Sequence, residues 1–283
     1  MAEYFVARGL PVPPELTRGP LAQWRRLAVI ALAILTVYIG LRITKIDISS
    51  ANPEYAAGVI IQLFHWDFRI LSPRDQFETF WDTAEGQMII TIFLGIIATA
   101  FSIVVALPLS FLGARNIMAG NPLTAAIYVI VRLMFTIIRS IDVLIVVIIF
   151  GVFIGIGSAA GVLALAFHNV GVLGKLYSEA IEGIDPGPLE AITATGANRV
   201  QVIWTAVLPQ IVNPYISFTI YRLDTNVRLA PILGLVGGGG IGILLFQSVN
   251  LAAYGAAGLI IFMIVITVAA MDFASAQIRK RLV

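Results

Sequence analysis

The chain alternates long apolar stretches with short polar ones. A helix that crosses a bilayer needs about 20 mostly apolar residues. Six stretches come close to this length or exceed it, and polar or turn-forming residues separate them: Leu27–Ile43, Met88–Leu112, Thr124–Phe150, Ala159–Tyr177, Ile211–Leu235 and Ala253–Phe273. The pattern therefore predicts an all-α, polytopic membrane bundle with six transmembrane helices.

Composition supports a membrane protein and narrows its chemistry. Hydrophobic residues make up 59% of the 283 residues and charged residues 12%, whereas a soluble domain carries about 25% charged residues. The absence of cysteine excludes disulfides and thiolate metal sites. The two histidines, His65 and His168, predict no metal cluster. A formal charge of +2 gives no reason to expect nucleic acid as a partner.

Basic residues mark one side of the membrane, because short cytoplasmic loops are enriched in Lys and Arg. With the N-terminus inside, four basic groups fall on the cytoplasmic side: Arg8, Arg18, Arg25 and Arg26; Arg115; Arg199; and Arg279, Lys280 and Arg281. Both termini are therefore expected in the cytoplasm. The predicted divisions are a tail over residues 1–26, an anchor span over 27–43, an extracytoplasmic loop over 44–87 and a transmembrane core over 88–283.

The anchor span 27–43 and the loop 44–87 each have two interpretations. The span 27–43 follows basic residues as a signal peptide would, but no convincing cleavage site follows it, which favours an uncleaved anchor. Aromatic residues interleaved with charges favour a helix lying in the membrane interface within the loop 44–87; a direct role in binding a partner is the alternative. These aromatic residues are Phe64, Trp66, Phe68, Phe77, Phe80 and Trp81.

One cytoplasmic segment, residues 182–210, is too polar to span the membrane yet is patterned as helix. Asp185 before Pro186 predicts a capped helix start. Gly196 separates two helical patterns and lets the backbone turn. Pro209 is expected to end the second helix, because it lacks a donor. We refer to residues 182–210 as the coupling loop and expect two short helices joined at a glycine, a rigid lever across the cytoplasmic mouth.

This segment resembles the signature of the binding-protein-dependent ABC importer permeases. That signature is E-A-A, three residues, G, nine residues, I, one residue, L-P. The chain matches it at Glu190, Ala191, Gly196, Leu208 and Pro209, and departs from it at Ile192 and Ala206. The resemblance implies a type I ABC importer permease fold, in which these residues couple the spans to a separate ATPase subunit.

Further stretches resemble the phosphonate branch of these permeases. They are residues 161–182, GVLALAFHNVGVLGKLYSEAIE, and 221–242, YRLDTNVRLAPILGLVGGGGIG. The resemblance covers roughly Glu78 to the C-terminus. After R-S-I the branch usually has proline, where this chain has Asp142.

The family resemblance also carries expectations about substrate and partners. The implied substrate is an oxyanion of the phosphonate, phosphite or phosphate class, imported across a bacterial inner membrane. The implied partners, besides membrane lipid, are a second copy of the chain, a solute-binding protein and two ATPase subunits that bind ATP and Mg. This chain needs no cofactor of its own, and it contains no G-x-x-x-x-G-K-[ST] nucleotide loop.

Charged residues interrupt the apolar spans and have two interpretations. They are Arg132, Arg139, Asp142, Arg222, Asp224 and Arg228. Such residues usually face a bundle interior. Internal ion pairs would fix helix register, and Arg139 and Asp142, three residues apart, are expected to share a helical face on which they could pair. Alternatively, the excess of cations lines a substrate pathway, to which we assign Arg222, Arg228, Arg139 and Asp142.

A glycine cluster after the fifth predicted span has a structural and a functional interpretation. Gly237, Gly238, Gly239 and Gly240 favour a tight bend that lets two helices approach closely, with a contribution to a gate as the alternative. His168, in the fourth predicted span, is expected to form a hydrogen bond in the bundle interior rather than act as a gate.

Two other functional classes compete with an ABC permease. An ion-gradient-driven secondary transporter of a small anion often shows broken helices in both halves, whereas glycine interruption occurs here in one place. An intramembrane enzyme requires a nucleophile with a base, or a metal, and neither constellation is visible. The sequence therefore favours a permease, not an enzyme.

Overall fold

The computed structural model describes residues 8–9, 20–44, 52–72, 79–118 and 120–280, which form helices and turns without a strand among them. The chain divides into two compact units, Met1–Ala57 and Gly58–Val283. The first contains α2 (Pro20–Ile43), whose side chains from Trp24 onward are largely exposed. Most of the predicted tail, residues 1–26, lies outside the described residues, but its last seven residues belong to α2.

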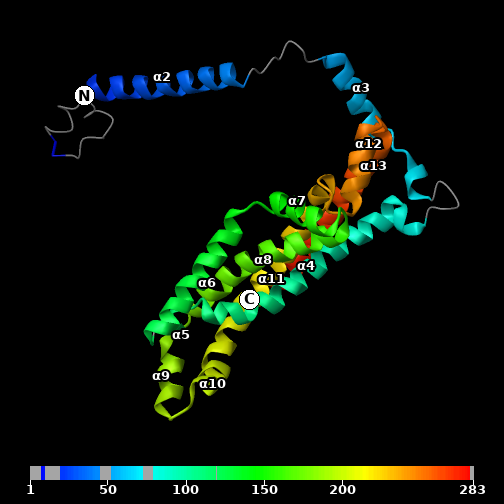
Figure 1. The fold of residues 1–283 in the computed structure, drawn as a ribbon. Helices are drawn as coiled ribbons and strands as arrows, with labels where there is room; N and C mark the ends of the chain where they lie inside the picture. The colour runs from blue at the N-terminus through cyan, green and yellow to red at the C-terminus, as the bar shows by residue number, and fades with distance from the viewer. Residues whose placement is uncertain (1–7, 10–19, 45–51, 73–78, 119, 281–283) are drawn as a thin grey trace. The chain divides into compact units, whose positions relative to one another are not determined.

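The second unit is a helical bundle (Figure 1). α3 (Pro53–Phe64) straddles the boundary between the units. The elements that follow are η2 (Phe68–Leu71), η3 (Phe80–Asp82), α4 (Ala84–Leu112), α5 (Arg115–Met118), α6 (Pro122–Ser140), α7 (Val143–Ile154), α8 (Ser158–Glu182), α9 (Pro186–Ala194), α10 (Arg199–Val202), the π-helical η4 (Ile203–Val207), α11 (Leu208–Leu235), α12 (Ile241–Asn250) and α13 (Tyr254–Lys280).

Five helices in the described part of the chain are long and apolar enough to cross a membrane: α2 from Trp24 onward, α4, α6, α8 and α13. The all-α membrane bundle is thus confirmed. The fifth predicted span, Ile211–Leu235, lies inside α11, which has 28 residues. α11 is long enough to cross, since a helix rises 1.5 Å per residue, but Arg222, Asp224 and Arg228 make it more polar than the other five.

The predicted single span Thr124–Phe150 is wrong, because the helix breaks between Ser140 and Val143. Asp142 causes the break: its carboxylate accepts a hydrogen bond from the Leu144 N–H at 2.8 Å and caps α7. His168 Nδ1 on α8 donates to the Ile141 carbonyl oxygen at 3.2 Å, at this break. His168 therefore forms the interior hydrogen bond that was predicted for it.

Small residues let the central helices pack closely. α4 and α8 make the most extensive helix–helix contact in the bundle. Ala98 on α4 and Ala164 on α8 are fully buried in one apolar cluster. A methyl group added to Gly95 of α4 would lie 2.8 Å from a Val227 methyl on α11, so glycine is needed there. Small side chains allow the van der Waals contact that holds membrane helices together.

The segment predicted as an extracytoplasmic loop, residues 44–87, differs from its prediction in local structure. In place of one interfacial helix through the aromatic stretch, α3 ends at Phe64 and two short 3-10 turns follow it. The Trp66 ring contacts the Phe262 ring of α13 with centroids 4.4 Å apart and planes tilted by 30°, so Trp66 packs on the bundle. Phe77 lies outside the described residues. The alternation of aromatic and charged residues therefore did not predict the short turns that this stretch forms, in which Trp66 packs on α13 while Phe68, Phe80 and Trp81 remain exposed.

The glycine cluster forms the turn between α11 and α12. Gly237, Gly239 and Gly240 have φ angles of 97°, 81° and 74°, a backbone region that favours glycine. A methyl group on Gly239 would lie 2.5 Å from Ser158 Oγ at the start of α8. The Gly157 N–H donates to the Gly237 carbonyl oxygen at 2.8 Å, which joins this turn to the N-terminus of α8.

Candidate functional site

The coupling loop forms a helical hairpin at the end of the bundle where α5 and α8 terminate (Figure 1). Asp185 caps α9 by accepting from the Gly187 N–H at 2.9 Å, and Pro186 occupies the first turn. Gly196 has a φ of 83°, which turns the chain back between α9 and α10. The predicted first short helix and the turn at the glycine are therefore present in the structure, whereas the second helix is not a separate short one but runs on into α11.

The surface of the hairpin is open. Glu190, Ala191 and Gly196 are exposed, and a methyl group added to Gly196 would meet no atom within 4 Å. Val200 and Trp204 are also exposed, Trp204 at 71%. Trp204 lies in η4, so this exposed aromatic side chain provides apolar surface on the second arm of the hairpin.

The base of the loop is anchored in an apolar cluster. Leu208 is half-buried against a set of buried residues, whereas Pro209 is exposed at the start of α11. The buried members of this cluster are Ala114, Ile181, Val207 and Ile211. The structure thus places three signature residues on the hairpin and two where it joins α11.

Pro209 does not end the second helix, contrary to the prediction. Helical backbone continues from Arg199 through η4 into α11. A π-helical turn precedes Pro209. The Leu208 N–H bonds to the Ile203 carbonyl oxygen, five residues back, so this turn is wider than an α-helical turn. Pro209 follows the π-helical turn directly, as the second residue of α11.

Gln210 ties the two ends of the coupling loop together, a role that sequence inspection did not reveal. Its Oε1 accepts from the Asp185 N–H at 2.9 Å, and its Nε2 donates to the Ala206 carbonyl oxygen at 2.9 Å. A longer bond of 3.4 Å joins Nε2 to the Asp185 carbonyl oxygen. Since an amide both donates and accepts, one side chain links the start of α9 to the start of α11.

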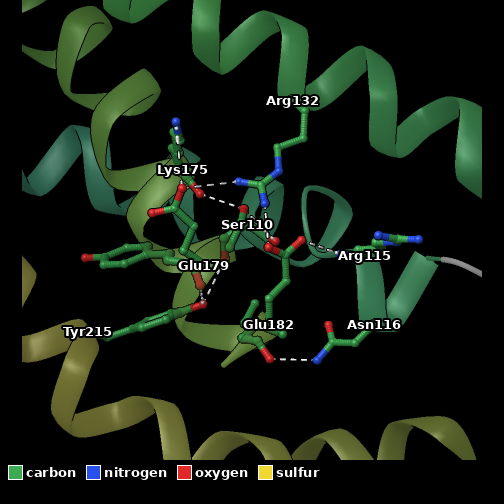
Figure 2. Close-up of polar contacts among 12 residues, drawn as sticks. Ser110, Arg115, Asn116, Arg132, Lys175, Glu179, Glu182 and Tyr215 are labelled. Carbon is green, nitrogen blue, oxygen red and sulfur yellow. Dashed lines mark hydrogen bonds and ion pairs between the residues drawn. The ribbon is translucent and has the colours of Figure 1, made fainter. Parts of the chain in front are cut away.

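Glu182, the last residue of α8, connects the loop to two other helices (Figure 2). Its Oε2 lies 2.5 Å from Arg132 Nη2 on α6. Its Oε1 accepts from the backbone N–H of Arg115 on α5 at 2.8 Å. Asn116 Nδ2 donates to the Ile181 carbonyl oxygen at 2.7 Å and satisfies a terminal acceptor of α8.

The remaining ion pairs of this cluster are longer and more exposed. Glu179 Oε1 lies 3.8 Å from Arg132 Nη1 and 3.7 Å from Lys175 Nζ, and the Glu179 side chain is 47% exposed. Exposed pairs of this length contribute little free energy. Glu182 is therefore the principal acidic partner of Arg132, as Figure 2 shows.

A tyrosine pair connects α8 to α11 on the neighbouring side of the cluster. The Tyr177 and Tyr215 rings stack with centroids 4.0 Å apart. The Tyr215 hydroxyl lies 3.0 Å from Ser110 Oγ on α4 and donates to the Tyr177 carbonyl oxygen at 3.3 Å. The end of the bundle that carries the hairpin is thus held by contacts among α4, α5, α6, α8 and α11.

The intramembrane charges of α11 point to different neighbours. Arg222 is buried and its guanidinium donates to Asn169 Oδ1 on α8. Arg228 is half exposed and forms ion pairs with Asp224 at 3.3 Å and with Asp272 on α13 at 2.6 Å. The two arginines do not share a face. Sequence inspection missed Asn169 and Asp272; an acid near the end of the apolar stretch of α13 was the available signal for Asp272.

Arg139 and Asp142 do not share a helical face, so that expectation was wrong. α6 ends at Ser140, and the Asp142 carboxylate is engaged in capping α7. Both residues are exposed at the break between α6 and α7. Across the described ranges, no group of three His, Cys, Asp or Glu residues lies close enough together to hold a metal ion.

The chain is similar to known transport proteins. The family model described as "Binding-protein-dependent transport system inner membrane component" matches residues 116–283. The phosphate-import permease protein PhnE of Mycolicibacterium smegmatis is 38% identical over 201 residues, 71% of this chain and 36% of that protein. The phosphite transport system permease protein PtxC of Stutzerimonas stutzeri is 38% identical over 193 residues, 68% of this chain and 69% of that protein.

A solved structure supports the same fold. An inward-facing MetNI methionine ABC transporter chain superimposes with a TM-score of 0.60 at 24% identity, covering 69% of this chain and 94% of that one. This chain spans about a third of the length of the first relative and about two thirds of the second. On the family match and the identity to PtxC, the chain belongs to the family of binding-protein-dependent transport system inner membrane components.

Proposed function

We propose that this chain is the permease subunit of an ATP-driven importer for an oxyanion of the phosphonate, phosphite or phosphate class. The observation that carries the proposal is the exposed helical hairpin of the coupling loop, tied at its base by Gln210 and Glu182. Family membership and the printed names of the relatives support the substrate class.

The assembly proposed for this function has several partners in a bacterial inner membrane. A second copy of the chain completes the translocation pathway, and two ATPase subunits bind ATP and Mg. A solute-binding protein delivers the anion from outside, and membrane lipid surrounds the apolar faces. Both termini of the chain lie in the cytoplasm, which places the hairpin beside the ATPases.

In the proposed mechanism, this chain receives and transmits force. Glu190, Ala191 and Gly196 on the hairpin dock on an ATPase subunit. Displacement of the hairpin passes through Leu208 and Pro209 into α11, and through Glu182 into α5, α6 and α8. The bundle then alternates between inward- and outward-facing arrangements while the ATPases supply the energy.

The pathway residues differ in how they are held. Arg228 already has two carboxylate partners, so we propose that it fixes the register of α11 against α13. Arg222 has no carboxylate within ion-pair distance in the described ranges, so we propose it as the contact for the anion. Arg139 and Asp142 border the pathway at the α6–α7 break, and Gly237–Gly240 allow α11 and α12 to bend as a gate.

Reconstitution tests the proposal. The permease is co-expressed with the ATPase and binding protein encoded beside it, purified and placed in proteoliposomes. Uptake of labelled methylphosphonate, phosphite and phosphate is measured with ATP, with a non-hydrolysable analogue and with an ion gradient alone. ATP-dependent uptake of one of these anions is the expected result. Uptake driven by the gradient without ATP would favour a secondary transporter.

A further inference from the structure

Arg222 and Asn169 form a buried pair whose geometry fixes the orientation of the amide. Arg222 is 8% exposed and Asn169 is fully buried. The Arg222 Nε donates to Asn169 Oδ1 at 3.0 Å, and Nη2 donates to the same oxygen. Arginine has no acceptor, so the amide oxygen must face the guanidinium. The amide nitrogen therefore faces away from it.

That nitrogen is unsatisfied. Asn169 Nδ2 is enclosed and has no hydrogen-bond partner among the described residues. Leaving a buried donor unpaired costs about 1–3 kcal/mol, and most buried polar side-chain atoms in native structures are paired. The buried amide nitrogen of Asn169, on α8, therefore favours binding of a hydrogen-bond acceptor.

The pair also carries an uncompensated charge. In the described part of the chain, no carboxylate lies within ion-pair distance of Arg222. The neighbouring acid on α11, Asp224, is engaged by Arg228, which also binds Asp272. Close to the pair on α8, His168 Nδ1 already donates to the Ile141 carbonyl oxygen. The free energy cost of burying an unpaired cation is several kcal/mol, so the pair favours an anionic partner.

We infer that Arg222 and Asn169 together bind one oxyanion during transport. The pair offers donors and positive charge, and its own acceptor, Asn169 Oδ1, is already used by Arg222. Two further buried oxygens on α11, Asp224 Oδ1 and Asn226 Oδ1, also have no partner among the described residues. The planar guanidinium suits the paired oxygens of a phosphoryl group, and Asn169 Nδ2 donates to a further oxygen. A water molecule would satisfy the amide but leave the charge unpaired. This inference rests on the proposed function and names the anion contact within it.

Asn169→Asp is the decisive variant, since it is nearly isosteric and supplies the missing carboxylate from the protein itself. If the pair is an anion site, Asn169→Asp will assemble with a thermal midpoint equal to or above that of the wild type. ATP hydrolysis stimulated by the binding protein will persist, but oxyanion uptake will fall at least about tenfold, as expected for losing a charge-assisted contact.

Asn169→Leu is the companion variant, because it removes both the amide oxygen and the amide donor at similar volume. A purely structural Asn169 predicts that Asn169→Leu loses stability and uptake while Asn169→Asp retains both. An anion site predicts that both variants lose uptake and that Asn169→Asp alone keeps its stability. Normal uptake by Asn169→Asp overturns the inference.

Binding is also measured without transport. The purified permease–ATPase complex, without the binding protein, is heated with phosphate, methylphosphonate or chloride, and the shift in its thermal midpoint is recorded. Stabilisation by an oxyanion in the wild type, absent in Asn169→Asp, supports the site even if no ATP-driven uptake is found and the proposed function fails. Equal shifts in both proteins, or no shift in either, overturn the inference while leaving the transport assay to decide the function.

Discussion

Replacing Glu182 with glutamine tests whether the end of α8 is held to α5 and α6 as the structure indicates. The substitution keeps the shape of the side chain and an oxygen that can accept from the Arg115 N–H. It removes the charge that pairs with Arg132 at 2.5 Å. The variant therefore isolates the ion pair from the packing around it.

The magnitude follows from burial. The Arg132 and Glu182 side chains are 21% and 25% exposed, so the pair lies between the exposed and buried cases. Exposed pairs contribute about 0.2–1 kcal/mol, and breaking a buried pair costs about 3–5 kcal/mol. We expect Glu182→Gln to lower the free energy of unfolding by about 2 kcal/mol. At about 2–4 °C per kcal/mol, the thermal midpoint should fall by about 4–8 °C.

Glu179→Gln is the matched control, because Glu179 belongs to the same cluster on the same helix. Its pairs span 3.7 and 3.8 Å and its side chain is 47% exposed. Its loss should lower the free energy of unfolding by less than about 1 kcal/mol. Both variants are purified with the ATPase and melted in lipid nanodiscs, and the anions transported per ATP hydrolysed are measured in proteoliposomes.

Equal effects of Glu182→Gln and Glu179→Gln would refute the reasoning. A double-mutant cycle with Arg132→Gln gives a second check, since residues in one ion pair show coupling energies of about 0.5–3 kcal/mol. A coupling energy near zero between Arg132 and Glu182 would mean that the pair does not hold α8 to α6. If the pair also transmits force, Glu182→Gln should raise the ATP hydrolysed per anion more than Glu179→Gln does.

Three further substitutions test other parts of the chain. Gly196→Leu should abolish uptake while the protein stays in the membrane, because leucine is strained at a φ of 83° and its volume blocks docking on the ATPase. Gly196→Asn, which tolerates a positive φ better, should keep part of the uptake. Normal uptake by the assembled leucine variant contradicts this prediction. A methyl group at Gly242 would overlap the Pro231 carbonyl oxygen, so Gly242→Ala should cost about 1–3 kcal/mol of stability. Gly151→Ala, which meets no atom within 4 Å, is its control and should not destabilise; equal melting points refute the packing argument. Arg228→Gln should lower the thermal midpoint and leave uptake per assembled complex normal, because the buried Asp224 loses its cation; lost uptake at unchanged stability would return Arg228 to the pathway.

Sequence reasoning located the helices well where hydrophobicity alone decides. The stretch Met88–Leu112 lies within α4 and Ala159–Tyr177 within α8, because each is a long, predominantly apolar run. The fusion of α6 and α7 into one predicted span failed for a local reason. Asp142 is a side-chain cap in the middle of an apolar run, and counting apolar residues gives one polar residue little weight.

The coupling loop shows a second limit of local reasoning. Asp185, Pro186 and Gly196 act as their local chemistry predicts, because a cap, a fixed φ and a positive φ are properties of single residues. Pro209 does not, because its effect depends on whether the preceding turn can widen. The π-helical turn at Ile203–Val207 supplies that freedom, and hydrophobic periodicity contains no signal for it.

Tertiary partners could not be predicted from spacing. The ion pair between Arg132 and Glu182 joins residues 50 positions apart, and Arg222 meets Asn169 across 53 positions. The sequence shows that such charges must be compensated, but the choice of partner depends on which helix faces which. Asn169 attracted no attention because a single asparagine in an α-helix is unremarkable until its neighbour is known to be an unpaired cation.

α11 brings these observations into one physical element. It begins at the coupling loop with Leu208 and ends beside the glycine turn that contacts the start of α8. Arg222 lies 14 residues beyond Leu208, or about 21 Å along the axis at 1.5 Å per residue. Pro214 lies inside α11 between these two positions and removes one backbone hydrogen bond, so the helix can bend there. A tilt imposed at the first turn displaces Arg222, relative to any neighbour that does not tilt with it, to the extent that the helix transmits the tilt past this proline. Asn169 belongs to α8, and the Glu182 contacts hold the end of that helix to α5 and α6. Relative motion of α11 and α8 therefore changes the distance between the Arg222 guanidinium and Asn169 Nδ2. Under the proposed function, the hairpin proposed to dock on an ATPase and the pair proposed to bind the anion are thus joined through two adjacent helices, α11 and α8.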